Sequence, residues 1–116
     1  MSVAFDGIGT EVLTFQGEGI QENSFAIMSE NQTVQRSREG TAPVGLVLNC
    51  RGGHVAVQVR GYIQTGFSVS APPKLGWNQM VCNDRGGLRS ATPEEIGRAC
   101  LVVDMNAETH TMGLFL

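Results

Sequence analysis

The chain has 116 residues, the length of a single domain, and only 16% of them are charged, against about 25% in an average soluble domain. No stretch of about 18 apolar residues could span a membrane, and the three cysteines are unsuited in number and spacing to a disulfide framework or a zinc site. Fifteen glycines, about twice the average share, indicate many turns between short strands.

The charges are unevenly distributed along the sequence. The first 35 residues contain five acidic side chains and no lysine or arginine, whereas the rest of the chain carries eight basic and six acidic groups. Scattered arginines without an aromatic platform are not typical of nucleic-acid binding, so we expect no nucleic-acid partner. The first seven residues lack the pattern of a secretory signal, and we expect synthesis in the cytoplasm with reduced cysteines.

Residues 1–40 are polar, with short apolar stretches separated by glycines. Strands are predicted at 3–5, 12–15 and 25–28, and the breaks between them contain Gly-Ile-Gly, Gly-Glu-Gly and Asn-Ser. Two interpretations remain open for this segment: edge strands joined by long turns, or an extended arm that orders against a neighbour. In either case it precedes a predicted compact β domain at 41–116.

From residue 42 onward the apolar pattern has a period of two, which indicates strands. A short apolar strand at 44–48 is followed by a turn and by an alternating strand at 54–60, in which Val55, Val57 and Val59 share one face. Further strands are predicted within 62–69, before the Ala-Pro-Pro break, at 79–82 and at 88–90. The last pair is predicted at 96–103 and 109–116.

Only one place has a helical signal. Thr92-Pro93-Glu94-Glu95 has the layout of a capping box, with proline at the first helical position, but Gly97 follows at once. A single helical turn near 92–96 is therefore the most helix we expect. The predicted fold is all-β: a small barrel or sandwich of about seven to nine short, mainly antiparallel strands, with an extended N-terminal segment.

A short motif occurs twice. Asn49-Cys-Arg-Gly-Gly and Asn83-Asp-Arg-Gly-Gly each follow a predicted strand. Asparagine and paired glycines favour tight reversals of the chain, which predicts turns. A phosphate-binding loop is the alternative, but neither copy is followed by the helix that such a loop requires.

The sequence offers few candidates for chemistry. His54 and His110 are the only histidines, and Cys50 lies four residues before His54 without a determined geometry. The carboxylates have no metal-ligand spacing, so we expect no catalytic site, metal or cofactor, and we expect the cysteines to be packing residues. Trp77 is predicted to pack over the end of the sheet or barrel, or to anchor an interface.

An ordered series of glycine and apolar positions carries a family resemblance. It starts with Ala-Pro-Val-Gly-Leu-Val at 42–47, continues with the alternating strand that runs into Arg60-Gly61, and includes Leu75-Gly76, Gly86-Gly87-Leu88, Ile-Gly-Arg-Ala at 96–99 and the apolar end at 113–116. This two-thirds of the chain resembles the small decoration, or cement, proteins of tailed-bacteriophage and prophage capsids. The first 40 residues do not fit the pattern.

The resemblance implies a non-enzymatic virion protein. Such a protein binds the major capsid protein on the outer surface of the shell and stabilises the head, often as a homotrimer, without cofactor, membrane or nucleic acid. For this chain the candidate capsid-binding residues are Val3, Phe5, Ile8, Val12 and Phe15 of the leading segment, together with Trp77. Val3, Phe5 and Ile8 are expected to insert as alternate side chains of an added strand. Deletion of residues 1–16 is expected to leave the β body folded.

Two other functions remain open. The first is another virion part, such as a head–tail joining, tail-tube or fibre-associated β domain. The second is a small ligand- or metal-binding β-barrel in which Cys50, His54 and Trp77 line the site.

Overall fold

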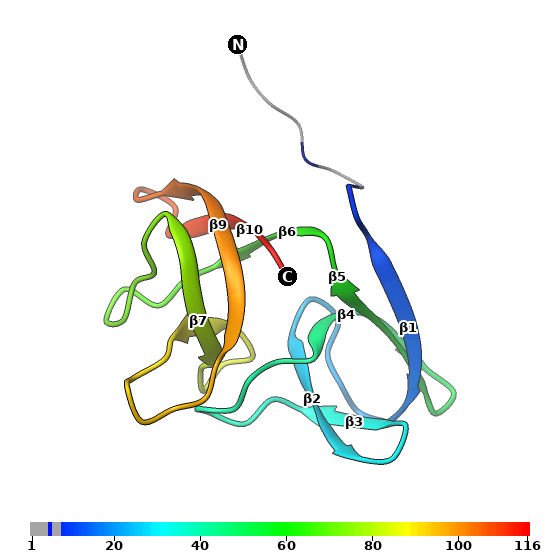
Figure 1. Cartoon of the computed structure of the whole chain (residues 1–116). Coiled ribbons are helices and arrows are strands. Elements are labelled where there is room, and N and C mark those ends of the chain that lie inside the picture. Colours follow the sequence, from blue (N-terminus) through cyan, green and yellow to red (C-terminus); the bar gives the residue numbers. More distant parts are fainter. Residues whose placement is uncertain (1–4, 6–7) are drawn as a thin grey trace.

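A computed structural model describes Phe5 and residues 8–116, and over these residues the chain is all-β with no helix. The all-β prediction is confirmed (Figure 1). There are ten strands where seven to nine were expected: β1 Glu11–Gln16, β2 Phe25–Glu30, β3 Thr33–Arg36, β4 Gly45–Arg51, β5 His54–Arg60, β6 Tyr62–Gly66, β7 Gly76–Cys82, β8 Leu88–Ser90, β9 Arg98–Asn106 and β10 Thr111–Phe115.

The first five strands form a closed barrel in the order β1-β3-β2-β4-β5. β4 and β5 are joined by the two residues Gly52 and Gly53, both with positive φ, as a tight hairpin requires. Val55 and Val57 point into the barrel and are completely buried, and Val59 packs against the same cluster. The predicted alternation of this strand is confirmed.

The last five strands form a second sheet in the order β6-β10-β9-β7-β8. Its core-facing residues include Ile63, Met80, Cys100, Val102 and Leu114, all buried. A single parallel bridge between Phe67, just after β6, and Leu88 of β8 links the two edges of this sheet. The second sheet is therefore almost closed as well.

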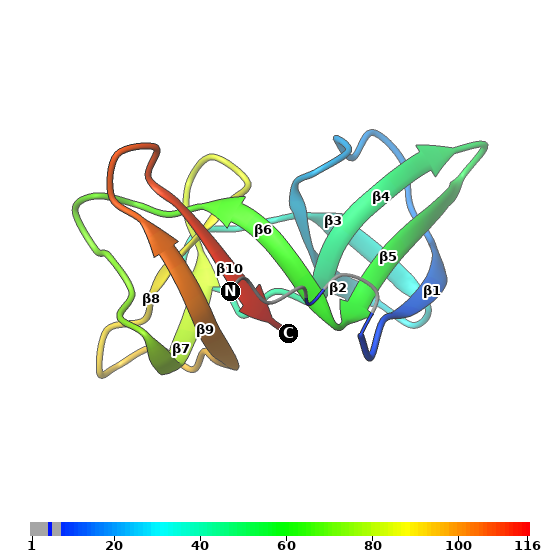
Figure 2. The same ribbon diagram turned by 90° about the horizontal axis from the view of Figure 1, so that it is seen from above.

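The two halves of the chain have the same topology. In the first half, β1 pairs antiparallel with β5 and parallel with β3, and the order β3-β2-β4-β5 completes the circle. In the second half, β6 pairs antiparallel with β10, is bridged in parallel to β8, and the order β8-β7-β9-β10 completes the circle. Figure 2 shows the two halves side by side. The fold is thus a tandem structural repeat, with β1 equivalent to β6 and β5 to β10.

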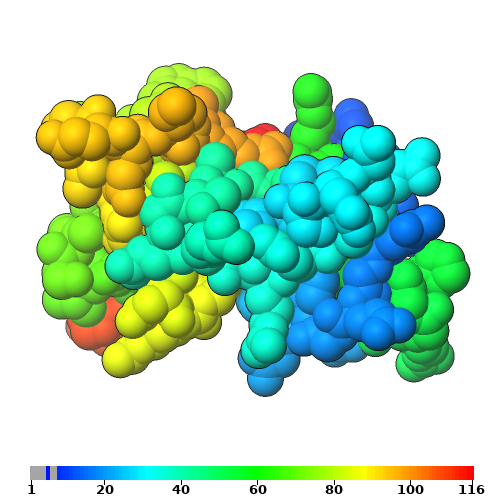
Figure 3. Space-filling model, turned by 90° about the horizontal axis from the view of Figure 1, so that it is seen from below, coloured from blue at the N-terminus to red at the C-terminus, as the bar shows by residue number. Residues whose placement is uncertain are grey.

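The core of the second sheet includes residues of both halves, whereas the first barrel has a cluster of its own. Phe25, Ile27 and Leu46 belong to the first barrel but pack in the same cluster as the core of the second sheet. The segment between β3 and β4 lies across the seam (Figure 3), where Gly40 N–H donates to the Cys82 carbonyl and Cys82 N–H donates to the Thr41 carbonyl. The second sheet therefore depends on the first half to cover its inner face.

Residues 11–36 supply three strands of the first barrel. β1 pairs with β5 at six positions, and the β2–β3 hairpin adds a strand at 33–36 that the sequence analysis did not predict. Of the strand predicted at 3–5, Val3 lies outside the described residues and Phe5 is not in a strand. Because β1 belongs to the barrel, a deletion that tests the leading segment must stop before Thr10 rather than at Gln16.

Candidate partner-binding surface

The outer face of the second sheet carries a row of large apolar side chains. Trp77 of β7 is directly opposite Leu101 of β9, Leu101 is opposite Phe115 of β10, and Phe115 is opposite Tyr62 of β6. Directly paired residues point to the same side of a sheet, so these four side chains form one continuous line, about 14 Å long at the usual strand spacing. We call it the outer row.

One end of the outer row is covered by the chain itself and the other end is bare. The Phe5 ring lies 5.5 Å from the ring of Tyr62 and 5.4 Å from that of Phe115, which gives a cluster of three aromatic rings. Trp77, in contrast, is 68% exposed, and the neighbouring Leu75 is exposed as well. The structure thus places Phe5 and Trp77, two of the predicted partner-binding residues, at opposite ends of one surface.

The tandem repeat shows what an outer row can do. In the first half the equivalent positions are Phe25 opposite Leu46, Leu46 opposite Gln58, and Gln58 opposite Val12. Phe25 is completely buried, and Leu46 and Gln58 are at most 9% exposed, because this row lies against the second half. Three of the four positions of the first-half row are therefore buried at the interface, and only Val12 is exposed. In the second half the equivalent row is covered by Phe5 at one end and is bare at Trp77.

The remaining predicted residues lie at or near β1. Ile8 is exposed in the turn before the strand, Val12 is exposed on the outer face, and Phe15 is half-buried against the barrel core. Beyond its pairing with β5, β1 has one parallel partner position, Gln16 with Thr33, so the edge from 11 to 15 is unpaired (Figure 1). This leaves Leu13 about half exposed although it is paired with the buried Val57.

Leu13 and Ile63 make a direct comparison between the halves. Leu13 pairs with the fourth residue of β5 and Ile63 with the fourth residue of β10, so the two occupy equivalent core-facing positions. Ile63 is only 4% exposed and lies in the cluster with Phe25 and Leu46, whereas Leu13 is 49% exposed. The first barrel is therefore exposed at Leu13, beside the unpaired edge of β1, whereas the equivalent position of the second half is covered.

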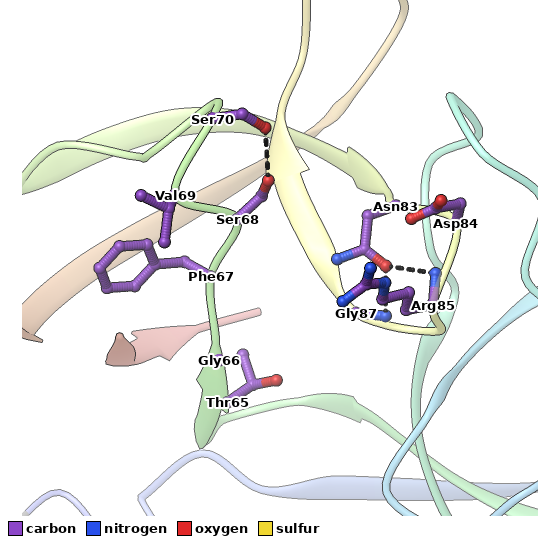
Figure 4. Close-up of a pocket in the computed structure, with 10 residues that line it drawn as sticks. All are labelled: Thr65, Gly66, Phe67, Ser68, Val69, Ser70, Asn83, Asp84, Arg85 and Gly87. Atoms are coloured by element: carbon purple, nitrogen blue, oxygen red, sulfur yellow. Dashed lines mark hydrogen bonds between the residues drawn. The ribbon is translucent and has the colours of Figure 1, made fainter. Parts of the chain in front are cut away.

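An open pocket of about 600 Å³ lies between the segment after β6 and the turn at 83–87 (Figure 4). In this turn the Asn83 side-chain oxygen accepts hydrogen bonds from the N–H groups of Arg85 and Gly87, at 2.8 and 2.9 Å. Those donors are used within the turn, so the turn interpretation is confirmed for this second copy of the Asn-x-Arg-Gly-Gly motif. In the first copy Asn49, Cys50 and Arg51 belong to β4, and only Gly52 and Gly53 form the turn. The pocket lining mixes polar and apolar residues, and Asp84 and Arg85 are its only charged side chains.

The residues suggested for a ligand-binding barrel do not lie in one sheet. Cys50 and His54 belong to the β4–β5 hairpin of the first barrel, whereas Trp77 is on the outer face of the second sheet. The barrel interior is filled by valine, alanine and isoleucine side chains. Within the described part of the chain there is no group of three or more histidine, cysteine or acidic side chains placed to hold a metal ion.

Sequence reasoning missed most of the outer row. In the sequence, Tyr62, Leu101 and Phe115 look like ordinary members of alternating strands. Only the pairing of β6, β10, β9 and β7 brings them into line with Trp77.

Over Phe5 and residues 8–116, the structure has no helix that could serve as a membrane span. The chain matches no protein-family model, no curated protein and no solved structure.

Proposed function

We propose that this protein is a structural component of a phage or prophage virion that binds the major capsid protein on the outer surface of the head and stabilises it. The proposal starts from the resemblance of residues 42–116 to capsid decoration proteins. It assigns the chain a role in assembly rather than in catalysis, with the virion as its place of action and copies of itself as neighbours.

One observation carries the proposal: a small, charge-poor β body groups exposed apolar side chains at two places, in addition to single exposed ones such as Val69 and Ile96. Trp77 and Leu75 are exposed on the outer face of the second sheet, and Ile8 and Val12 are exposed at the start of the first barrel. Exposed apolar surface that the fold does not need marks protein–protein contacts. Two such surfaces suit a protein that contacts both a shell and its own neighbours.

Ile8 and Val12 are the proposed shell contacts. They are 55% and 46% exposed and adjoin the leading segment. The outer row then remains available for contacts with neighbouring copies of the protein. In this assignment Phe5 is not a shell contact, because its ring packs on Tyr62 and Phe115 of its own chain.

The experiment is co-sedimentation with heads of the phage or prophage that encodes the protein. The double variant Ile8→Ser/Val12→Ser should lose head binding at least tenfold while keeping the circular dichroism spectrum of the parent. Val69→Ser, which also removes an exposed apolar side chain but lies in the segment after β6, is the control. Equal binding by the double variant and the control would contradict the assignment of the shell contact.

A further inference from the structure

We propose that copies of this chain bind one another head to tail, with the outer row of the second half of one copy covering the open inner side of the first half of the next, around Leu13. This contact repeats between molecules the contact that already joins the two halves within one molecule. It does not depend on capsid binding and can be tested with the isolated protein.

The internal contact is the precedent. Phe25 and Leu46, in the outer row of the first half, pack in one cluster with the inner residues Ile63 and Leu114 of the second half. The outer row of one repeat thus covers the inner side of the following repeat. Because both halves have the same topology, the outer row of the second half can cover the first half of another copy in the same way.

Each half leaves one side of that contact unused. The outer row of the second half is bare at its Trp77 end, where Trp77 is 68% exposed. In the first half Leu13, beside the unpaired edge of β1, is 49% exposed, whereas the equivalent Ile63 is 4% exposed. One molecule therefore carries both complementary surfaces, one at each end, and neither surface meets the other within the same chain.

The outer row is uncharged and can be covered without desolvating an ion. It consists of Trp77, Leu101, Phe115 and Tyr62, and the face of β1 that carries Leu13 also carries Phe15, with the exposed carboxylate of Glu11 at the start of the strand. The proposed contact is therefore centred on Leu13 and Phe15 and leaves Glu11 at its margin, where its charge stays in water. A head-to-tail contact closes into a ring when its rotation permits and continues as a fibre when it does not.

Trp77 is the only tryptophan, so its fluorescence reports on the proposed contact directly. In the wild-type protein, the emission maximum should move to shorter wavelength as concentration rises, and the mass measured by light scattering should exceed the 12.4 kDa of one chain. Trp77→Lys and Leu13→Lys should each remain monomeric. Ile96→Lys, which places the same charge at an 88% exposed position outside the row, should assemble like the wild type.

Mixing the two defective variants is the decisive step. Leu13→Lys keeps its outer row and its tryptophan, while Trp77→Lys keeps its Leu13 surface and has no tryptophan. Their equimolar mixture should form a species of twice the monomer mass, and the emission of Leu13→Lys should shift as Trp77→Lys is added. If Leu13→Lys is not folded by circular dichroism, Leu13→Ser takes its place in the same mixture.

A wild-type protein that stays monomeric at high micromolar concentration would overturn the proposal. So would a mixture that stays monomeric while the wild type assembles, because that result means that the outer row contacts its own counterpart in a two-fold dimer. If Trp77→Lys alone assembled to the mass of the wild type, the outer row would not form part of the contact, and the proposal would be wrong.

Discussion

The carboxylate of Glu95 organises the turn between β8 and β9. Both Arg89 guanidinium nitrogens donate to it at 2.8 Å, and the Thr92 N–H donates to it at 2.9 Å. The bond from Thr92 is the capping-box bond that the sequence predicted. Residues 92–95 form a hydrogen-bonded turn rather than a helical one, with the Glu95 N–H donating to the Thr92 carbonyl. The bidentate pair with Arg89 was not predicted, because it depends on where β8 ends. Hydrogen bonding to Arg89 first, and to Thr92 second, lowers the pKa of Glu95 to about 2.

This lowered pKa predicts acid sensitivity in a defined range. A carboxyl group whose pKa is lower in the folded protein stabilises it fully above the ordinary value of 4.5, and this stabilisation is lost as the pH falls toward about 2. The free energy of unfolding of Glu95→Gln should therefore depend less on pH between 4.5 and 2 than that of the wild type. Carbon NMR of the Glu95 carboxyl group checks the cause, and a midpoint near 4.5 would contradict it.

The three cysteines are predicted to differ in reactivity. Burial raises the pKa of both Cys82 and Cys100 to about 11, and the positive charge of Arg98 offsets only part of this effect at Cys100. Cys50 is only half-buried. At pH 8 a thiol reagent should modify one group in the native protein and three after unfolding, and Cys50→Ser should leave no fast-reacting group. Fast modification of Cys82 or Cys100 in the native state would show that the shared core is not packed as described.

At the scale of strands, the local sequence pattern predicted where strands lie better than it predicted which strands pair with one another. The alternation of Val55, Val57 and Val59 identified β5, and paired glycines identified the β4–β5 turn. The β2–β3 hairpin was missed beyond residue 28, because Val34 is the only buried residue of β3 and polar residues surround it. The equivalence of the halves was not predictable either, since the visible Asn-x-Arg-Gly-Gly repeat occupies turns that are not equivalent in the two halves.

One strand position is sensitive to a single methyl group. Tyr62 lies across Gly113 of the neighbouring β10, and a Cβ added at Gly113 would be 2.9 Å from two carbons of the Tyr62 ring. Gly113→Ala should therefore lower the free energy of unfolding by about 1–3 kcal/mol, because the ring and its contacts with Phe5 and Phe115 must shift. In Gly66→Ala, by contrast, the nearest atom would be 3.5 Å away, at ordinary contact distance. Equal urea midpoints for the two variants would contradict this placement of Tyr62.

At the scale of the whole molecule, the two repeats are joined through Arg98. Its guanidinium group donates hydrogen bonds to the carbonyls of Pro43 and Val44 and to that of Val59, so one side chain of the second sheet serves three acceptors of the first half. Together with the shared cluster around Phe25 and Leu46, this makes the halves one cooperative unit. A single unfolding transition is therefore expected for the whole chain.

Removing the guanidinium group of Arg98 should lower the free energy of unfolding of the whole chain. Arg98→Met keeps the aliphatic length but leaves carbonyls at the seam without their donor, which should cost about 1.5–3 kcal/mol of unfolding free energy. Arg38→Met, at an exposed position in the segment between β3 and β4, is the matched control. Urea unfolding followed by Trp77 fluorescence and by far-ultraviolet circular dichroism gives both midpoints. A variant as stable as the control would mean that Arg98 does not join the halves.

The proposed role as a head-binding structural protein is tested most directly by adding the purified full-length chain to assembled heads and, separately, to free capsid subunits, and measuring the bound fraction by sedimentation. We predict saturable binding to assembled heads, no binding to free subunits, and heads that withstand higher temperature once the protein is bound. Failure to bind assembled heads at any concentration, or equal binding to free subunits, would contradict the account.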